Sequence, residues 1–99
     1  MSRVVMVLDD PLDRADIPEL CELFSSLLQN GRPDHVVCDV SGLADPDAVA
    51  VDALARLQLV ARGFGLRLCV RNAQRELEQL LELVGLNGVL VVEPRREAE

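Results

Sequence analysis

The chain is 99 residues long, which suits one domain with a single hydrophobic core. Hydrophobic residues make up 49% of it, so an intrinsically disordered chain is not expected. The net charge of −7 at pH 7 argues against binding to nucleic acid or to an anionic membrane, because both require a basic protein surface.

The N-terminal segment lacks the pattern of a secretory signal. Its apolar run at residues 4–8 is followed at once by Asp9 and Asp10, and it is too short for a signal core. No apolar stretch in the chain approaches the length of a membrane span. We therefore expect a cytoplasmic protein that does not insert into a membrane.

The first two predicted elements are a strand and an amphipathic helix. Residues 4–8 form a continuous apolar run, which is typical of buried strands in parallel sheets. The helix is predicted to begin at Asp16, a favourable N-cap residue, and to tolerate Pro18 in its first turn. Its apolar residues recur at helical spacing, and Asn30 and Gly31 are expected to end it.

A second strand and a second helix follow. Residues 35–40 are predicted to form the strand, which is closed by the pair Ser41–Gly42. The helix has either Asp45 or Asp47 as its candidate N-cap, and it extends to about Arg62. Both carboxylates precede the first helical turn closely enough to act as a cap, so both interpretations are kept.

The last third of the chain contains two strands and one helix. Residues 66–71 alternate between apolar and polar side chains, so one face of that strand should meet water or the strand should lie at an edge. Residues 74–84 are predicted to form a helix with one apolar face, and residues 89–92 a strand that ends at Pro94.

The order of these elements predicts an α/β fold. Strand and helix alternate as βαβαβαβ with short connections, which favours a mostly parallel four-stranded sheet with three main helices and right-handed crossovers. Residues 1–94 are predicted to form a single domain, and residues 95–99 a solvated C-terminal tail.

No pattern in the sequence indicates catalysis, a cofactor or a metal ion. The chain has one histidine, His35, and it lacks both the Gly-x-Ser-x-Gly motif and the phosphate-binding glycine loops. The three cysteines are widely spaced within apolar segments and form no Cys-x-x-Cys pair: Cys21, Cys38 and Cys69. We predict a protein that is not an enzyme.

The acidic pair Asp9–Asp10 directly follows the first predicted strand, as in response-regulator receiver domains. In that family the pair holds Mg²⁺, and a lysine late in the chain contacts the phosphoryl group. This chain contains no lysine, and the planar guanidinium of arginine does not replace a compact ammonium group. An acidic turn ahead of a helix is therefore the favoured interpretation.

Residues 36–52 contain a strand, the sequence Asp-Val-Ser-Gly-Leu, a polar turn and the start of a long helix. This pattern resembles the STAS family, which includes bacterial anti-sigma factor antagonists. In the same order, residues 12–16 resemble the family's Leu-Asp segment, residues 66–73 its strand ending in Asn, and residues 80–90 its closing helix-Gly-Leu-strand. The resemblance covers nearly the whole chain and implies a STAS-like fold.

One departure from the family concerns its phosphorylation site. In STAS regulators the second helix begins Asp-Ser-Ser-Gly or Asp-Ser-Thr-Gly, and a partner kinase phosphorylates the second hydroxyl residue. Aligning on residues 39–42 places Asp47 on the family's Asp, and Ala48 and Val49 on the hydroxyl positions. Neither side chain carries an oxygen, so the resemblance implies a regulator without serine/threonine phosphorylation control. Ser41 remains as the serine at the strand end.

The second helix carries more apolar surface than one buried face requires. We assign Val51, Leu54 and Leu57 to the core. The apolar residues that spread to the flank are Val49, Ala53 and Val60, with Leu59 as a further candidate. An apolar flank with a charged rim is typical of a protein-docking surface, although tight packing between neighbours is the alternative. The predicted protein-binding residues are Asp45, Asp47, Ala48, Val49, Asp52, Ala53 and Arg56.

Together, these features predict a non-catalytic STAS-like regulatory protein without a cofactor or metal. The expected partner is an anti-sigma factor or another kinase-type signalling protein, which would place the chain in the regulation of bacterial transcription. The alternative is a cytoplasmic accessory subunit of a lipid or anion transporter, as some family members are. A homodimer is also left open.

Overall fold

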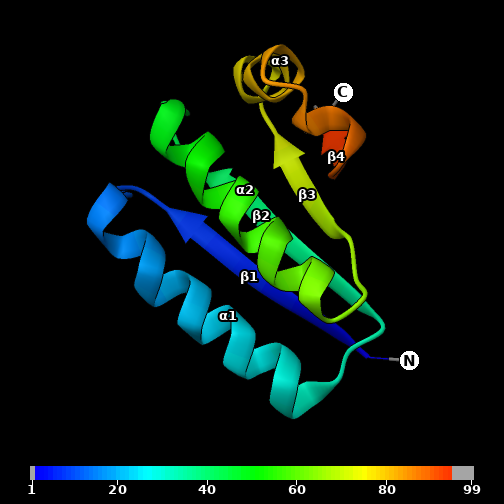
Figure 1. The fold of residues 1–99 in the computed structure, drawn as a ribbon. Coiled ribbons are helices and arrows are strands. Elements are labelled where there is room, and N and C mark those ends of the chain that lie inside the picture. Colours follow the sequence, from blue (N-terminus) through cyan, green and yellow to red (C-terminus); the bar gives the residue numbers. More distant parts are fainter. Residues whose placement is uncertain (1, 95–99) are drawn as a thin grey trace.

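Strands and helices alternate along residues 2–94, which are the residues that the computed structural model describes (Figure 1). The predicted order of three helices and four strands is confirmed. The elements are β1 (Arg3–Asp9), α1 (Ile17–Gly31), β2 (His35–Gly42), α2 (Ala48–Gly63), β3 (Leu68–Ala73), α3 (Arg75–Leu83) and β4 (Val91–Pro94), with short 3₁₀ turns at Arg14–Asp16 and Leu86–Gly88. The predicted tail at residues 95–99 lies outside the described residues.

The four strands form one sheet in the order β1-β2-β3-β4, and every neighbouring pair is parallel. Each new strand is therefore added on the same side of the previous one. Because each crossover is right-handed, all three helices are carried to the same face of the sheet. In Figure 1, α2 accordingly lies in front of β2, and α1 runs beside it along β1.

The hydrophobic core lies between this face of the sheet and the helices. The strands contribute alternate residues to it, as the twofold side-chain period of a strand requires. Phe24 of α1 is fully buried there, together with leucines from α2 and α3. The largest buried side chains are Phe24, Leu8, Ile17, Leu28, Leu54, Leu57, Leu68, Leu77, Leu81, Val36, Val40 and Val70.

The interpretation of residues 4–8 as a strand buried on both faces is wrong. Met6 and Leu8 are buried, but Val5 is 44% exposed and Val7 is 53% exposed. The reason is topological, because three crossovers on one face leave the other face of the sheet without a helix from residues 2–94. The alternation predicted for the third strand is found, although β3 is an interior strand between β2 and β4.

Several element boundaries differ from the predicted ones. The helix α1 begins directly after Asp16, but the Asp16 carboxylate accepts a hydrogen bond from the backbone N–H of Asp13 (3.1 Å) rather than from the helix. At its end, Arg32 and not Gly31 takes the left-handed conformation, with φ at 43°. The strand β3 begins two residues late, because the N–H of Leu66 still bonds to the carbonyl of Ala61 at the end of α2.

Gly42 lets the ends of β1 and β2 approach each other closely. Its carbonyl accepts a hydrogen bond from the N–H of Asp10 (3.3 Å), just after a register shift between the two strands. A Cβ atom at this position would lie 3.0 Å from the carbonyl oxygen of Leu8 and would collide with the Asp9 side chain. The end of the Asp9 side chain is the nearest obstacle and can rotate away, but the Leu8 carbonyl oxygen belongs to the backbone of β1, so a Cβ here would press the two strands apart.

We therefore predict that Gly42→Ala lowers the free energy of unfolding by about 1–3 kcal/mol, the usual cost of forcing an atom into a packed site. Urea unfolding followed by circular dichroism measures it. Gly63→Ala is the matched control, since a Cβ there meets nothing within 4 Å. Equal stability of Gly42→Ala and the parent chain would contradict the assigned role of Gly42.

Candidate functional site

The start of α2 is held by a side-chain cap, and the loop before it is held by a hydrogen bond from another part of the chain. The Asp47 carboxylate accepts the N–H groups of Val49 (3.0 Å) and Ala50 (3.2 Å), so Asp47 and not Asp45 is the N-cap. In the preceding loop, the Asp10 carboxylate accepts the N–H of Ala44 at 2.6 Å.

The same loop is tied to the start of α3. The side-chain amide of Gln74, the residue directly before α3, donates to the carbonyl of Leu43 at 2.9 Å. Leu43 itself is buried in the core. The loop therefore presents a defined surface between α2 and α3.

The predicted binding residues do not all lie on this surface. Asp45, Asp47, Ala48 and Arg56 are exposed, and Val49 and Asp52 are half-buried. Ala53 is 0% exposed, so its prediction as a contact residue is wrong. Its position on the helix lies on the same side as the buried residues Ala50, Leu54, Leu57 and Ala61, whereas Val51, assigned to the core, is only half-buried.

Three of the charged residues at the start of α2 and before α1 form a small ion-pair network. The Asp52 carboxylate accepts hydrogen bonds from Arg14 (3.1 Å) and from Arg56 (3.0 Å), which lies one helical turn further along α2. Both arginines are well exposed, so each pair contributes about 0–1 kcal/mol to stability. The network fixes the charged border of α2 on its α1 side.

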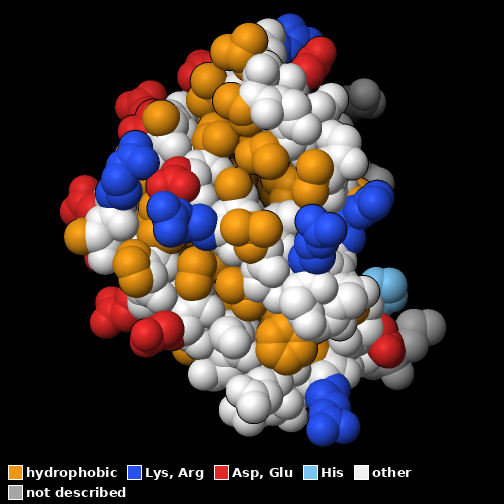
Figure 2. Space-filling model, viewed as in Figure 1, with side chains coloured by type: hydrophobic (Ala, Val, Ile, Leu, Met, Phe, Trp, Pro, Cys, Tyr) orange, Lys and Arg blue, Asp and Glu red, His pale blue; other side chains and the backbone are white. Residues whose placement is uncertain are grey.

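An apolar groove lies on the other side of α2 and was missed by the sequence interpretation. It has a volume of about 510 Å³ and lies between the loop before α2 and the helix α3. Leu83 is 82% exposed beside it, and Figure 2 shows hydrophobic side chains gathered over the junction of α2 with α3. We call this the α2–α3 groove, and its lining residues are Pro46, Glu76, Gln79, Leu80 and Leu83.

The sequence did contain a signal for this groove. The helix α3 buries Leu77 and Leu81, and Leu80 is half-buried next to them. Leu83 is an apolar residue that lies off this buried stripe in an otherwise strongly amphipathic helix. Such a residue points to solvent unless a partner covers it.

Asp39 links the carboxyl-terminal parts of β2 and β3 by hydrogen bonds. Its carboxylate accepts the N–H of Ser41 (2.9 Å) and the side-chain amide of Asn72 (3.2 Å), and Asn72 has a left-handed backbone with φ at 62°. The hydrogen bond from the Ser41 backbone, aided by the Ser41 hydroxyl, Asn72 and Arg71, lowers the pKa of Asp39 against the opposing effect of burial.

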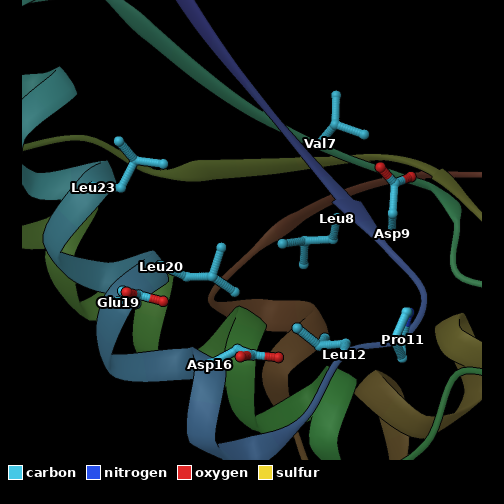
Figure 3. A pocket seen from close by; sticks show the side chains of 9 residues that line it. All are labelled: Val7, Leu8, Asp9, Pro11, Leu12, Asp16, Glu19, Leu20 and Leu23. Atoms are coloured by element: carbon cyan, nitrogen blue, oxygen red, sulfur yellow. The ribbon is translucent and has the colours of Figure 1, made fainter.

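A second hollow, of about 460 Å³, lies between β1 and α1 (Figure 3). Leu8 and Leu20 point toward each other across it, while the carboxylates of Asp16 and Glu19 lie at its border. It offers apolar walls and isolated acids but no nucleophile beside a base. Within residues 2–94, no three side chains of the metal-binding types come together.

No helix in the described part of the chain is both long and apolar enough to span a bilayer.

Comparison with known proteins identifies the family. The family model described as "Mlab, STAS domain" matches residues 1–93, so the chain belongs to the STAS domain family, as the sequence pattern predicted. The NMR structure of the protein TM1081 has the same fold, with a TM-score of 0.78 and 11% sequence identity over 94% of this chain and 74% of that chain. No curated protein matches the sequence significantly. The family indicates a regulatory or binding domain, of a kind that is generally non-catalytic.

The lowered pKa of Asp39 predicts a dependence of stability on pH. Its charged form is favoured in the folded protein, so its contribution is present above the ordinary aspartate pKa of about 3.9 and is lost as the pH falls through the lowered value. Asp39→Asn should reduce the free energy of unfolding by about 1 kcal/mol at pH 7, because a charged acceptor is replaced by a neutral one.

Urea titrations at a series of pH values measure this effect, and the gap between variant and parent should narrow under acid conditions. Asp45→Asn, at an exposed position near the same edge, serves as the control and should behave like the parent. A gap for Asp39→Asn that stays constant into strong acid would show that the carboxylate charge is not involved.

Proposed function

We propose that this protein is a non-catalytic STAS-type regulator that binds a protein partner through the start of α2 and the α2–α3 groove. The observation that carries the proposal is an apolar surface with Leu83 exposed and with Asp45 and Asp47 at its border. An apolar centre with a charged border is the usual composition of a docking site. The partner proposed first is an anti-sigma factor or a related kinase-type signalling protein in the bacterial cytoplasm.

The chemistry of the helix start supports binding without a phosphorylation switch. Ala48 and Val49 have no side-chain oxygen, and the Asp47 carboxylate already occupies the N–H groups of Val49 and Ala50. A fixed negative charge therefore sits at the positive end of the α2 dipole. A phosphate added nearby would meet this carboxylate and that of Asp45 rather than free N–H donors.

The border of the site suggests the chemistry of the partner. Asp45, Asp47 and Glu76 place carboxylates around the apolar residues Leu80 and Leu83. A complementary surface would carry aliphatic side chains at its centre and arginine or lysine at its edge. Such charges would speed the encounter and select against acidic partners.

A second partner class is a component of a lipid or anion transporter. The matching family model carries the name of Mlab rather than of the anti-sigma factor antagonists, and this keeps the transporter class open. The same surface would then dock on a transporter subunit. Affinity purification with the tagged chain separates the two classes: a kinase-fold protein supports the first, and a transport ATPase or permease supports the second.

We predict that Leu83→Asp and Val49→Asp each weaken binding of the purified partner by at least about tenfold, since a charge then enters the apolar contact. Because both positions are at least partly exposed, the circular dichroism spectrum should not change. Isothermal titration calorimetry measures the affinity.

Leu59→Asp is the matched control, because Leu59 is 65% exposed on the outward side of α2, away from the groove. Its affinity should equal that of the parent chain. Ala53→Asp, in contrast, should unfold the domain, because it places a charge in the core. Partner binding that is unaffected by Leu83→Asp and Val49→Asp would place the docking site elsewhere.

We also predict that the parent chain takes up no phosphate from a kinase-type partner and ATP, as judged by intact-protein mass spectrometry. Val49→Ser restores a hydroxyl at the family's modified position and is the matched variant for the same assay. Stoichiometric phosphate on Ser41 of the parent chain, whose side chain is exposed at the end of β2, would show that a modification switch is retained.

A further inference from the structure

The two edge strands of the sheet differ in how well they are protected from further pairing. The strand β4 is four residues long, carries Glu93 and ends at Pro94, which has no N–H to donate. The strand β1 is seven residues long and contains no proline, and its charged residues, Arg3 and Asp9, lie only at its two ends. Within residues 2–94, β1 pairs with β2 alone, so its outer side carries unpaired backbone N–H and C=O groups.

The hollow between β1 and α1 runs along this outer side. It is lined by three successive residues of β1: Val7, Leu8 and Asp9. Successive side chains of a strand point to opposite faces of the sheet, so one hollow contacts all three only at an edge of the strand. The inner edge is occupied by β2, which leaves the outer one. In Figure 3, Val7 and Asp9 accordingly lie on one side of β1 and Leu8 on the other.

Exposed apolar side chains gather on both elements that border the hollow. Val5 and Val7 of β1 are exposed, as are Leu23 and Leu27 of α1. Leu23 lines the hollow, and Leu27 lies one helical turn further along the same side of α1. We call these four residues, together with the outer side of β1, the β1 edge. An apolar surface beside unpaired strand backbone is a typical site for the addition of another strand.

The sequence of β1 is complementary to itself when it is read in the opposite direction. Burial alternates without interruption from residue 3 to residue 9, so the odd-numbered residues share one face and the even-numbered residues the other. Residues paired across an antiparallel ladder lie on the same face. The two-fold pairing that includes all seven residues is centred on Met6. Its pairs are Arg3 with Asp9, Val4 with Leu8, Val5 with Val7, and Met6 with its own counterpart.

This register matches charge with charge and apolar with apolar. The guanidinium of Arg3 lies opposite the Asp9 carboxylate at both ends of the ladder, and every pair between them is apolar. A slip by one residue would turn the buried side chains to the wrong face. A slip by two residues would set Arg3 opposite Val7, or Asp9 opposite Val5. The register centred on Met6 is therefore the favoured one.

We propose that a second copy of this chain adds its β1 to the β1 edge, in a two-fold antiparallel pair centred on Met6 that joins the two sheets into one. The backbone groups on the outer side of each β1 then find partners in the other copy. A two-fold contact of this kind closes on itself, so it gives a dimer and not a longer assembly.

The helix α1 fits this arrangement. The two-fold axis is perpendicular to the sheet, so both copies carry their helices on the same side and the two α1 helices flank the joint. The helix runs opposite to β1, and Leu20 faces Leu8 across the hollow. Met6 lies about 7 Å before Leu8, a distance that about four to five residues of a helix span. The level of Met6 is therefore reached between Leu23 and Leu27, so these exposed leucines of the two copies face each other across the joint.

The charges favour a second copy over a strand of another protein. The lining of the hollow contains three carboxylates and no basic residue: Asp9, Asp16 and Glu19. In the dimer, Arg3 of the second copy lies opposite Asp9 and brings a cation to this end of the hollow. A strand of another protein would need the same order of a basic residue, an apolar run and an acidic residue to match both ends of β1. A second copy supplies that order by symmetry.

Sedimentation equilibrium of the full chain tests the dimer. At about 150 mM salt the Debye length is about 8 Å, so repulsion between the two net charges is largely screened, and the parent chain should show a reversible monomer–dimer equilibrium. Val5→Lys and Val7→Lys should each raise the dissociation constant by at least about tenfold, because a lysine on an edge strand opposes pairing. The circular dichroism spectrum should not change, since both side chains are exposed.

Val91→Lys is the matched control for these variants. Val91 lies on the other edge strand, β4, and is exposed to nearly the same extent as Val5. This variant should dimerise like the parent chain.

Charge reversal tests the register. Arg3→Asp and Asp9→Arg should each weaken the dimer, because like charges then lie opposite each other at both ends of the ladder. The double variant Arg3→Asp/Asp9→Arg should regain most of the affinity, since the pairs are restored in reversed order.

Hydrogen exchange followed by mass spectrometry tests whether the strands themselves pair. Amides of residues 3–9 should exchange more slowly above the dissociation constant than below it, because the outer N–H groups of β1 become hydrogen-bonded. Amides of β4 should exchange at the same rate in both conditions.

Three results would overturn the proposal. The first is a chain that stays monomeric at all concentrations, which leaves the β1 edge to a strand of another protein. The second is a dimer that survives Val5→Lys and Val7→Lys or that is lost in Val91→Lys. The third is a dimer without added protection of β1. The α2–α3 groove lies on other elements, so Leu83→Asp should dimerise like the parent chain, and the dimer and partner binding at that groove fail independently.

Discussion

Right-handed crossovers between strands added always in the same direction determine how this domain is built. They bring α1, α2 and α3 to one face of the sheet, where a single core forms. A buried polar side chain links α2 to the sheet: Gln58 is 6% exposed, and its carbonyl oxygen accepts the N–H of Leu68 at the start of β3 (2.7 Å). This bond satisfies a buried donor that would otherwise cost about 1–3 kcal/mol.

The carboxyl ends of the strands place the candidate site. Because parallel strands end at one edge of the sheet, the turn after β2 lies next to the ends of β1 and β3. Gly42 allows β1 to approach, and Asp39 joins the turn to Asn72. The loop before α2 then lies beside α3, and the apolar groove forms between that loop and α3. The site is therefore a product of the strand ends and not of α2 alone.

Much of this could be predicted from the sequence, and the exceptions have physical causes. Helix and strand order follow from periodicity, and the family follows from the resemblance of residues 36–52 and the segments in order with it. The sequence narrows the cap of α2 to Asp45 or Asp47, and only the hydrogen bonds of the structure assign it to Asp47. The apolar run at residues 4–8 did not predict that Val5 and Val7 are exposed, because such a run does not reveal whether one face of the strand or both are covered. Ala53 was misplaced because α2 is apolar around much of its circumference, so its sequence does not distinguish flank from core. The groove depends on how α3 meets the loop before α2, which local patterns do not encode.

The loop between Gly42 and α2 is fastened at three points. Asp10 holds the N–H of Ala44, Gln74 holds the carbonyl of Leu43, and Asp47 holds the first turn of the helix. Backbone that is already immobile has little conformational entropy left to lose when a complex forms. Recognition at this loop should therefore resemble the docking of two rigid bodies, with affinity set by shape and desolvation rather than by a disorder-to-order transition.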